Sequence, residues 1–221
     1  MLSKLAQSIK TLGRREPVVD PASFNDPLAL RTSWTPCVRG GTNFRTHKLD
    51  VSDPNCVRFL PALGTKLFGG LFLLVGLGVT VGVTVSRLAS GNALEINLDT
   101  LVPLVLGLVF TVVGGVMLAQ FGKPIVFDKV KGYYWKGRQA PDQVFDPSTL
   151  KHCAPISRIH ALQLIAERCH GNKQSYYSYE LNLVLDDGER KNVIDHGNRK
   201  ALREDAQTLS AFLGKPVWDA T

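Results

Sequence analysis

The fold of this chain is decided by two uncharged stretches, LFGGLFLLVGLGVTVGVTVS at residues 67–86 and TLVPLVLGLVFTVVGGVMLAQFG at residues 100–122. Each is close to the roughly 20 apolar residues that a helix needs to cross the core of a bilayer. The link between them, residues 87–99, is only 13 residues long. The two stretches therefore predict a transmembrane helical hairpin over residues 67–121, with spans at 67–86 and 100–121, and a hairpin leaves both flanks of the chain on one side of the membrane.

Basic residues gather outside the outer ends of this hairpin. The net charge of +7 is distributed as +5 over residues 1–66, −1 over residues 67–121 and +3 over residues 122–221. Lys and Arg near the ends of spans favour the cytoplasmic side, and the link contains only Arg87. We therefore expect both termini in the cytoplasm. Anionic lipid headgroups suit these basic residues, and no nucleic-acid-binding motif accompanies them, so we expect no nucleic-acid partner.

The flanks of the hairpin differ from each other in character. Residues 1–41 predict a short amphipathic basic helix and a linker punctuated by prolines. The sequence leaves three interpretations of that helix open: it lies on the membrane surface, it docks on a partner, or it is partly disordered. Residues 42–66 predict two strands that join a cytoplasmic domain, and residues 122–221 predict the main part of that domain.

Residues 122–221 have the pattern of several strands followed by one helix. The clearest strand is residues 177–185, where apolar and polar side chains alternate with a period of two, as in a strand with one face in the core. Asn198 is placed to begin the last helix and Gly214 to end it. The other strands are predicted at residues 125–127, 133–135, 156–169 and 189–195.

This order of elements, carried by residues 177–213, resembles a pleckstrin-homology-like domain, a curved antiparallel sheet closed by a C-terminal helix. The chain is similar to small bacterial inner-membrane proteins that pair a two-helix transmembrane hairpin with such a domain. The resemblance implies a membrane α+β protein of the bacterial inner membrane. Two strands precede the hairpin here, so we expect the hairpin to be inserted in the domain, with residues 56–60 and 125–127 paired.

Small residues four apart mark possible contacts between the spans. Gly78 and Gly82 form such a pair in the first span, and Gly115 and Ala119 form one in the second. Small residues let helix backbones approach closely in lipid. We predict that these four residues pack the spans on each other; the alternative is a face for another membrane subunit. The spans contain no Asp, Glu, Lys, Arg or His, which argues against a transporter or a proton path.

Two groups of residues invite a catalytic or metal-binding interpretation. Cys153 and Cys169 each neighbour a histidine, and Cys and His are the usual ligands of zinc. A strand or a helix between them would hold them too far apart to share an ion. Asp195 and His196 are neighbours on a predicted strand and point to opposite faces. We therefore predict no enzyme activity, no metal and no cofactor.

One basic and aromatic segment is a candidate contact surface, because Tyr and Trp favour the headgroup level and Lys and Arg favour anionic lipid. We predict that it contacts lipid or a partner through Lys129, Lys131, Tyr133, Tyr134, Trp135, Lys136 and Arg138. The function we expect is that of a non-enzymatic, membrane-anchored binding module, an accessory or assembly subunit of a larger membrane complex. Another membrane or cytoplasmic protein is the expected partner, met at the edges of the sheet. The alternative is a module that binds anionic lipid.

Overall fold

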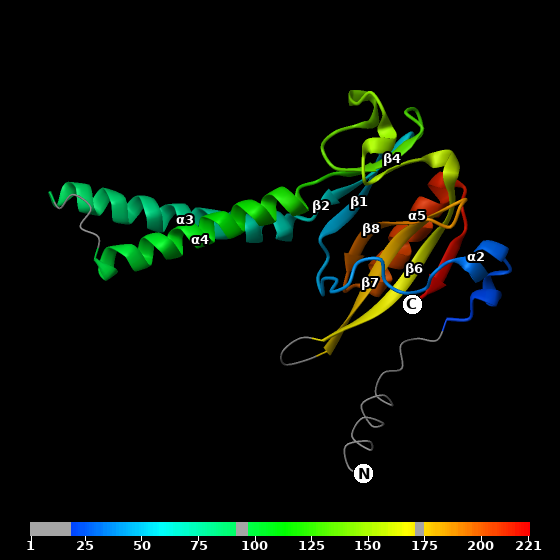
Figure 1. Cartoon of the computed structure of the whole chain (residues 1–221), viewed down its shortest axis with the longest axis horizontal. Coiled ribbons are helices and arrows are strands. Elements are labelled where there is room, and N and C mark those ends of the chain that lie inside the picture. The colour runs from blue at the N-terminus through cyan, green and yellow to red at the C-terminus, as the bar shows by residue number, and fades with distance from the viewer. Residues whose placement is uncertain (1–18, 92–96, 171–174) are drawn as a thin grey trace, which may run out of the picture. The chain divides into compact units, whose positions relative to one another are not determined.

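The computed structural model describes residues 19–91, 97–170 and 175–221 of the chain, which divides into two compact units. One unit, which we call the module, combines Met1–Phe59 with Ile125–Thr221; the other, Leu60–Pro124, is the helical hairpin. Figure 1 shows the elements of both units. The amphipathic helix predicted near the N-terminus lies outside the described residues.

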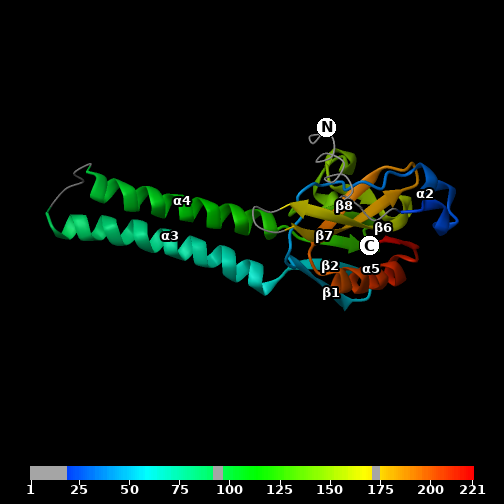
Figure 2. The same cartoon turned by 90° about the horizontal axis from the view of Figure 1, so that it is seen from below.

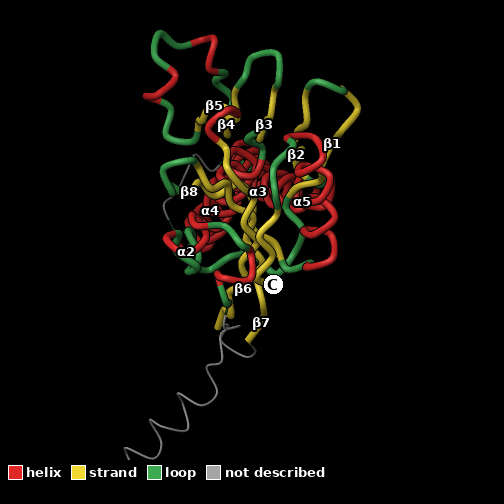
Figure 3. Tube along the Cα trace, turned by 90° about the vertical axis from the view of Figure 1, so that its right-hand side faces the viewer, coloured by secondary structure: helices red, strands yellow, loops and turns green. Residues whose placement is uncertain are grey.

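Five strands in the order β1-β2-β3-β4-β5 form the first sheet of the module. In β2 and β3, Phe59 lies opposite Ile125, which confirms the predicted pairing of the two strands that flank the hairpin. The predicted β3–β4 hairpin is also present. Turns β1–β2 and β3–β4 and the long β4–β5 connection leave the sheet at one end (Figure 3). The strands are β1 (His47–Asp53), β2 (Cys56–Pro61), β3 (Ile125–Asp128), β4 (Tyr133–Lys136) and β5 (Cys153–Pro155).

The second sheet has the order β8-β7-β6-β9. Strands β6, β7 and β8 form an antiparallel meander, and β9 pairs with β6 in parallel. The meander agrees with the predicted strands, whereas β9 follows the last helix and was not predicted. The strands of the second sheet are β6 (Ile159–His170), β7 (Ser175–Leu185), β8 (Arg190–His196) and β9 (Val217–Ala220).

Helix α5 (Arg199–Leu213) joins β8 to β9 and has the predicted ends. The side chain of Asn198 accepts a hydrogen bond from the backbone N–H of Ala201, which satisfies one of the free donors of the first turn. Gly214 ends the helix with a φ of +66°, a conformation that favours glycine. The buried side of α5, with Leu202, closes the core between the two sheets.

The apolar core lies between the inner faces of the sheets. Its members alternate along β2, β3 and β7, as expected for strands with one face in the core. The largest fully buried side chains of this core are Tyr134, Phe59, Phe127, Ile125, Ile159, Leu162, Leu164, Leu181, Leu183, Leu185 and Leu202.

Residues 19–46 run over the outer face of the second sheet, as the blue segment that leads from α2 to β1 in Figure 1 shows. The segment contains η1 (Pro21–Phe24) and α2 (Pro27–Arg31). Trp34 stacks on Phe24 with ring centroids 5.0 Å apart and lies 6.0 Å from Trp218 of β9. The described part of the predicted linker is therefore a packed layer of the module rather than a spacer.

The hairpin unit consists of α3 (Leu63–Ala89) and α4 (Leu98–Phe121), which run side by side in opposite directions (Figures 1 and 2). Both helices extend a few residues beyond the predicted spans. Both are long and apolar enough to cross a membrane, judged by length and composition.

The two helices meet through glycines other than the predicted ones. A Cβ on Gly76 would collide with the backbone nitrogen of Thr111, and a Cβ on Gly114 would collide with the backbone nitrogen of Leu73. Gly69 and Gly107 also face the opposite helix. Gly69 and Gly76, like Gly107 and Gly114, are seven residues apart, which is the repeat of a left-handed helix pair.

The predicted contacts of Gly78, Gly82, Gly115 and Ala119 are therefore wrong. A Cβ on any of these three glycines would meet no atom of the described structure within 4 Å, and Ala119 is exposed. Gly78 lies two residues beyond Gly76, which turns it about 200° around the helix, to the opposite side. A pair of small residues four apart identifies a smooth helix face but not the helix that covers it.

Candidate functional site

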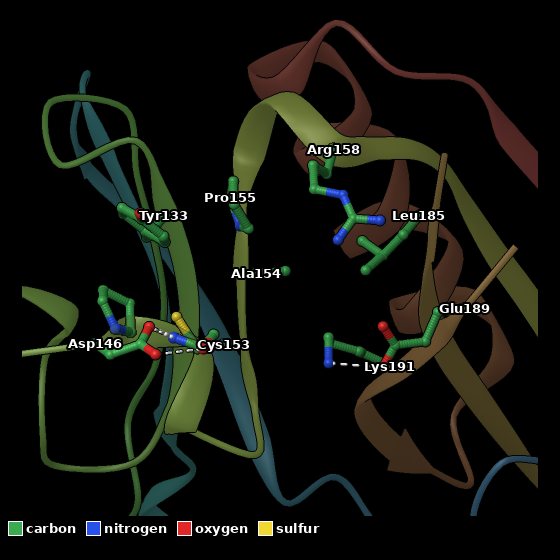
Figure 4. Close-up of a pocket in the computed structure, with 11 residues that line it drawn as sticks. Tyr133, Asp146, Cys153, Ala154, Pro155, Arg158, Leu185, Glu189 and Lys191 are labelled. Carbon is green, nitrogen blue, oxygen red and sulfur yellow. Dashed lines mark hydrogen bonds and ion pairs between the residues drawn. The ribbon is translucent and has the colours of Figure 1, made fainter. Parts of the chain in front are cut away.

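A cleft of about 310 Å³ lies in the module between the edge strands β5 and β8. Figure 4 shows its two walls. One wall contains Tyr133 of β4, strand β5 and the β4–β5 connection around Asp146; the other contains Arg158, Leu185 and β8. The lining combines charged groups with tyrosine, proline and leucine, so the cleft suits a ligand that is polar in part and apolar in part.

The cations of the cleft are each held by carboxylates of the same wall. Arg158 donates to Asp186 at 2.9 and 3.0 Å and to Asp187 at 2.5 Å. Lys191 Nζ lies 2.8 Å from a carboxylate oxygen of Glu189. Both lining cations therefore already have carboxylate partners, and with Asp146 the cleft has a net negative charge, which disfavours concentration of an anion.

The backbone edges that face the cleft have few groups to offer to an added strand. Pro155 has no N–H, and the N–H of Cys153 donates to the carbonyl of Leu150 at 3.1 Å. On β8, the carbonyl of Asn192 accepts from Tyr134 Oη at 3.3 Å and that of Val193 accepts from Lys136 Nζ at 3.0 Å. These backbone groups are therefore poorly suited to pair with an added strand.

The rim of the cleft carries an exposed aromatic residue on an ordered connection. Phe145 is fully exposed and directly precedes the cleft-lining Asp146. The carboxylate of Asp146 accepts from the backbone N–H of Ser148 at 2.9 Å, and that of Asp142 lies 2.6 Å from Lys131 Nζ. The short η2 (Pro141–Gln143) and η3 (Pro147–Thr149) stand on either side of Phe145.

The predicted contact segment does not form one surface. Tyr134 and Trp135 are buried on opposite faces of the first sheet, and Lys136 reaches inward to β8. Burial raises the pKa of Tyr134. These three residues hold the module together and are not available to lipid or to a partner. Successive side chains of a strand point to opposite faces, so residues that are adjacent in the sequence do not share one surface.

The remaining members of the segment lie at the surface, though apart from one another. Lys129 and Lys131 stand in the β3–β4 turn, where Lys129 Nζ lies 4.4 Å from the centre of the Phe212 ring. Lys131 is paired with Asp142, as given above. Arg138 is exposed in the β4–β5 connection, and Tyr133 is half-buried in the wall of the cleft. Only Tyr133 of the predicted set lines the cleft.

The residues considered above as catalytic or metal-binding candidates lie in different parts of the module. Cys153 lies in β5 and Cys169 near the end of β6, and burial raises the pKa of both thiols. Burial and the neighbouring carboxylate of Glu180 raise the pKa of Asp195 to about 6, whereas burial lowers the pKa of His196 to about 4. Within the described ranges, no group of three His, Cys, Asp or Glu side chains is placed to hold a metal ion.

Comparisons with protein-family models, with curated proteins and with solved structures found no match for this chain. The cleft and the Phe145 rim carry no motif, and they arise from residues up to 58 positions apart that the two-sheet fold brings together. The one signal in the sequence was the prolines of residues 141–155. They indicate a structured loop but do not show that the loop forms one wall of a cleft.

Proposed function

We propose that this chain is a membrane-anchored, non-enzymatic binding module of the bacterial inner membrane. In this proposal it serves as an accessory or assembly subunit, and the cleft between β5 and β8 receives a segment of a partner protein. The observation that carries the proposal is the cleft itself, whose cations are already paired with carboxylates and whose lining residue Asp146 is preceded by the exposed Phe145. Fully exposed aromatic residues held in place beside a pocket are typical anchors of protein interfaces.

The anchoring part of the proposal rests on the hairpin and on its place in the chain. The contact between α3 and α4 is made by glycines, as is usual for helix pairs in lipid, where apolar side chains gain nothing by leaving their surroundings. The chain leaves the module at Phe59 and returns at the paired Ile125. This pairing supports a placement of both flanks on one side of the bilayer, and the basic flanks favour the cytoplasmic side.

The order of elements in the module supports the pleckstrin-homology-like part of the proposal. Two packed sheets, antiparallel apart from the last strand β9, are combined with one C-terminal helix that closes the core. Domains of that kind are binding scaffolds more often than catalysts. The raised pKa values of the cysteine thiols at positions 153 and 169 also disfavour nucleophilic chemistry there.

Purification in mild detergent from native membranes tests the proposal. We expect a protein to remain attached in stoichiometric amount, to be identified by mass spectrometry and to be lost from the variants Phe145→Ala and Lys191→Ala. Val51→Ala, which removes an exposed apolar side chain of β1 away from the cleft, is the control and should retain it. Recovery of the protein without a companion, or retention of the companion by all three variants, would contradict binding through the cleft.

The same preparation distinguishes the lipid-binding alternative. Vesicles with and without anionic lipid are added to the purified protein, and the module's tryptophan fluorescence is followed. Charge reversal at Lys129 and Arg138, the two exposed cations of the predicted set without an observed carboxylate partner in the described residues, should leave this signal unchanged if the partner is a protein. A charge-dependent response to anionic vesicles would favour lipid instead.

A further inference from the structure

The outer face of β6, β7 and β8 holds a segment of the same chain by its backbone. The carboxylate of Glu180 accepts from the N–H groups of Cys37 and Val38 at 2.8 and 2.9 Å. The carboxylate of Glu167 accepts from those of Gly40 and Gly41 at 3.1 to 3.5 Å. We call residues 35–42 the strap. Contacts from two carboxylates of a sheet face to four main-chain donors are a mode of peptide recognition that needs no particular side chains.

Donors on the same face bind carbonyl groups of this segment in turn. The contacts are Gln163 Nε2 to Ser33 at 3.0 Å, Arg190 Nη1 to Thr35 at 2.8 Å, Tyr176 Oη to Gly41 at 2.9 Å and Ser178 Oγ to Thr42 at 3.0 Å. One position of the strap has no room for a side chain, because a Cβ on Gly41 would collide with the Ser178 hydroxyl. The strap bends at residues 37–40, and Gly40 has a φ of +78°, a conformation that favours glycine. The face is therefore shaped for a bent segment with glycine at two successive positions.

Only polar contacts keep the strap in place. The side chains of Thr35, Cys37, Val38 and Arg39 are all exposed. The apolar anchor of the N-terminal segment ends at Trp34, one residue before the strap begins. Release of the strap would uncover Glu180 and Asn182, which water can solvate, and the thiol of Cys169, which contacts the carbonyl of Gly41. Opening is thus a local event of low cost compared with unfolding of the sheet.

We propose that this face is a second binding surface, which receives a bent, glycine-containing peptide segment of a partner protein and is filled by the strap when no partner is bound. Three carboxylates, of Glu167, Glu180 and Asp195, and one guanidinium, of Arg190, take part in the contacts of the face. The net negative charge selects a neutral or basic segment, as the strap with Arg39 is. This surface is distinct from the cleft, so the proposal stands whether or not the cleft binds a protein.

A competition experiment in the full-length protein, held in detergent micelles, tests the proposal. The probe is a fluorescent peptide of residues 33–43, SWTPCVRGGTN. The variant Gly41→Val expels the chain's own strap, and we expect it to bind the probe at least about tenfold more tightly than the wild type does. Adding Glu180→Ala should remove that gain. Arg39→Ala leaves the strap in place and should behave as the wild type.

A second peptide and a second measurement keep the result decisive. The probe with Gly41→Val should not bind to any form of the protein. In the unaltered protein, hydrogen exchange at the amides of Cys37 and Val38 should be at least about a hundredfold faster than at the amides of β7, since the strap opens locally. Equal affinity of the wild type and Gly41→Val for the probe, or exchange of the strap amides only together with those of β7, would overturn the proposal.

Discussion

The module and the hairpin hold their parts together in opposite ways. The sheets of the module are joined by large side chains, such as Phe59, Phe127 and Leu181, that are fully buried between them. The helices of the hairpin are joined where side chains are missing, at Gly76 and Gly114. The difference follows from the surroundings that we propose for each unit. Apolar area drives association in water, whereas in lipid it gains nothing and close backbone approach takes its place.

The two kinds of contact respond differently to substitution. A contact made of side chains weakens gradually as atoms are removed, because each lost methylene costs a limited amount. A contact between two backbones is lost when a single side chain is added, because a backbone cannot relieve the collision by changing rotamer. The two kinds of contact can therefore be distinguished by one variant that adds atoms to the hairpin and another that removes atoms from the module.

The largest effect is expected for Gly76→Leu in the hairpin. The new side chain would meet the backbone of Thr111, so we expect a cost above the ~1–3 kcal/mol that is usual for overpacking. Cysteines introduced at Phe72 and Phe110, whose ring centroids are 5.2 Å apart, report the contact through cross-linking with a short bifunctional thiol reagent. The cross-link should form in the parent and be lost in Gly76→Leu.

Gly78→Leu is the matched control, because a Cβ there meets nothing within 4 Å. It adds the same side chain two residues away and should leave the cross-link intact. If Gly78→Leu abolishes the cross-link while Gly76→Leu preserves it, the glycine contact described above is wrong and the four-residue pair of the sequence is right.

A smaller effect is expected for Leu181→Ala in the module. Leu181 is fully buried, and truncation of a buried leucine lowers the free energy of unfolding by about 2–5 kcal/mol. All three tryptophans, at positions 34, 135 and 218, lie in the module, so their fluorescence in thermal or urea unfolding of the full chain reports on it. Gln207→Ala, on the exposed face of α5, should change stability by less than about 0.5 kcal/mol. Equal losses in both variants would contradict the placement of the core.

The inner faces of the strands could be predicted from the sequence, and so could much of the fold. The alternation of residues 177–185 identifies Leu181 and Leu183 as core residues, and both are fully buried. The β2–β3 pairing followed from the short apolar strands on either side of the hairpin. These features are local or periodic, and a periodic pattern is set by the geometry of the strand itself.

The outer face of β7 could not be predicted in this way. Ser178, Glu180 and Asn182 alternate with the core residues on the face that the period-two pattern leaves outside the core, yet each is at most 2% exposed. A segment about 140 residues earlier covers them, and it does so through its backbone, which leaves no pattern of side chains in the sequence. The rim at Phe145 and the glycine contact of the hairpin escaped prediction for the same reason, since each depends on what the fold brings opposite.

Truncation of the polar outer face should cost less than truncation of the core. Glu180→Ala removes the acceptor for the N–H groups of Cys37 and Val38 and for the side-chain amides of Asn182 and Asn192. Buried donors that lose their partner cost about 1–3 kcal/mol. Water can reach part of this face once the strap lifts, so we expect the lower half of that range in the same unfolding measurement.

Glu204→Ala removes an exposed carboxylate from α5 and is the control, with an expected change below about 0.5 kcal/mol. A loss for Glu180→Ala as large as that for Leu181→Ala would mean that the outer face is as important to stability as the core. The distinction between the two faces of β7 would then fail.

The smallest effect depends on pH and concerns Asp195, also on the outer face. Burial and the carboxylate of Glu180 raise its pKa from 3.8 to about 6, so its contribution to stability is present below about pH 4 and is lost as the pH rises through 6. Asp195→Asn lacks this loss. We expect the variant to match the wild type near pH 4 and to exceed its free energy of unfolding by about 1–2 kcal/mol at pH 7.5, with allowance for the partial exposure of the side chain.

The neighbouring His196 has the opposite sign and would hide this effect in the wild type alone. Its pKa is lowered to about 4 by burial and by the charges of Arg45 and His47, so its contribution is present above pH 6.5 and is lost as the pH falls toward 4. Both proteins contain His196, and Asp195 is not among the causes of its shift, so the difference between their unfolding curves isolates Asp195. A difference that is constant between pH 4 and 7.5 would mean that Asp195 is solvated, and that the strap does not cover this part of the sheet.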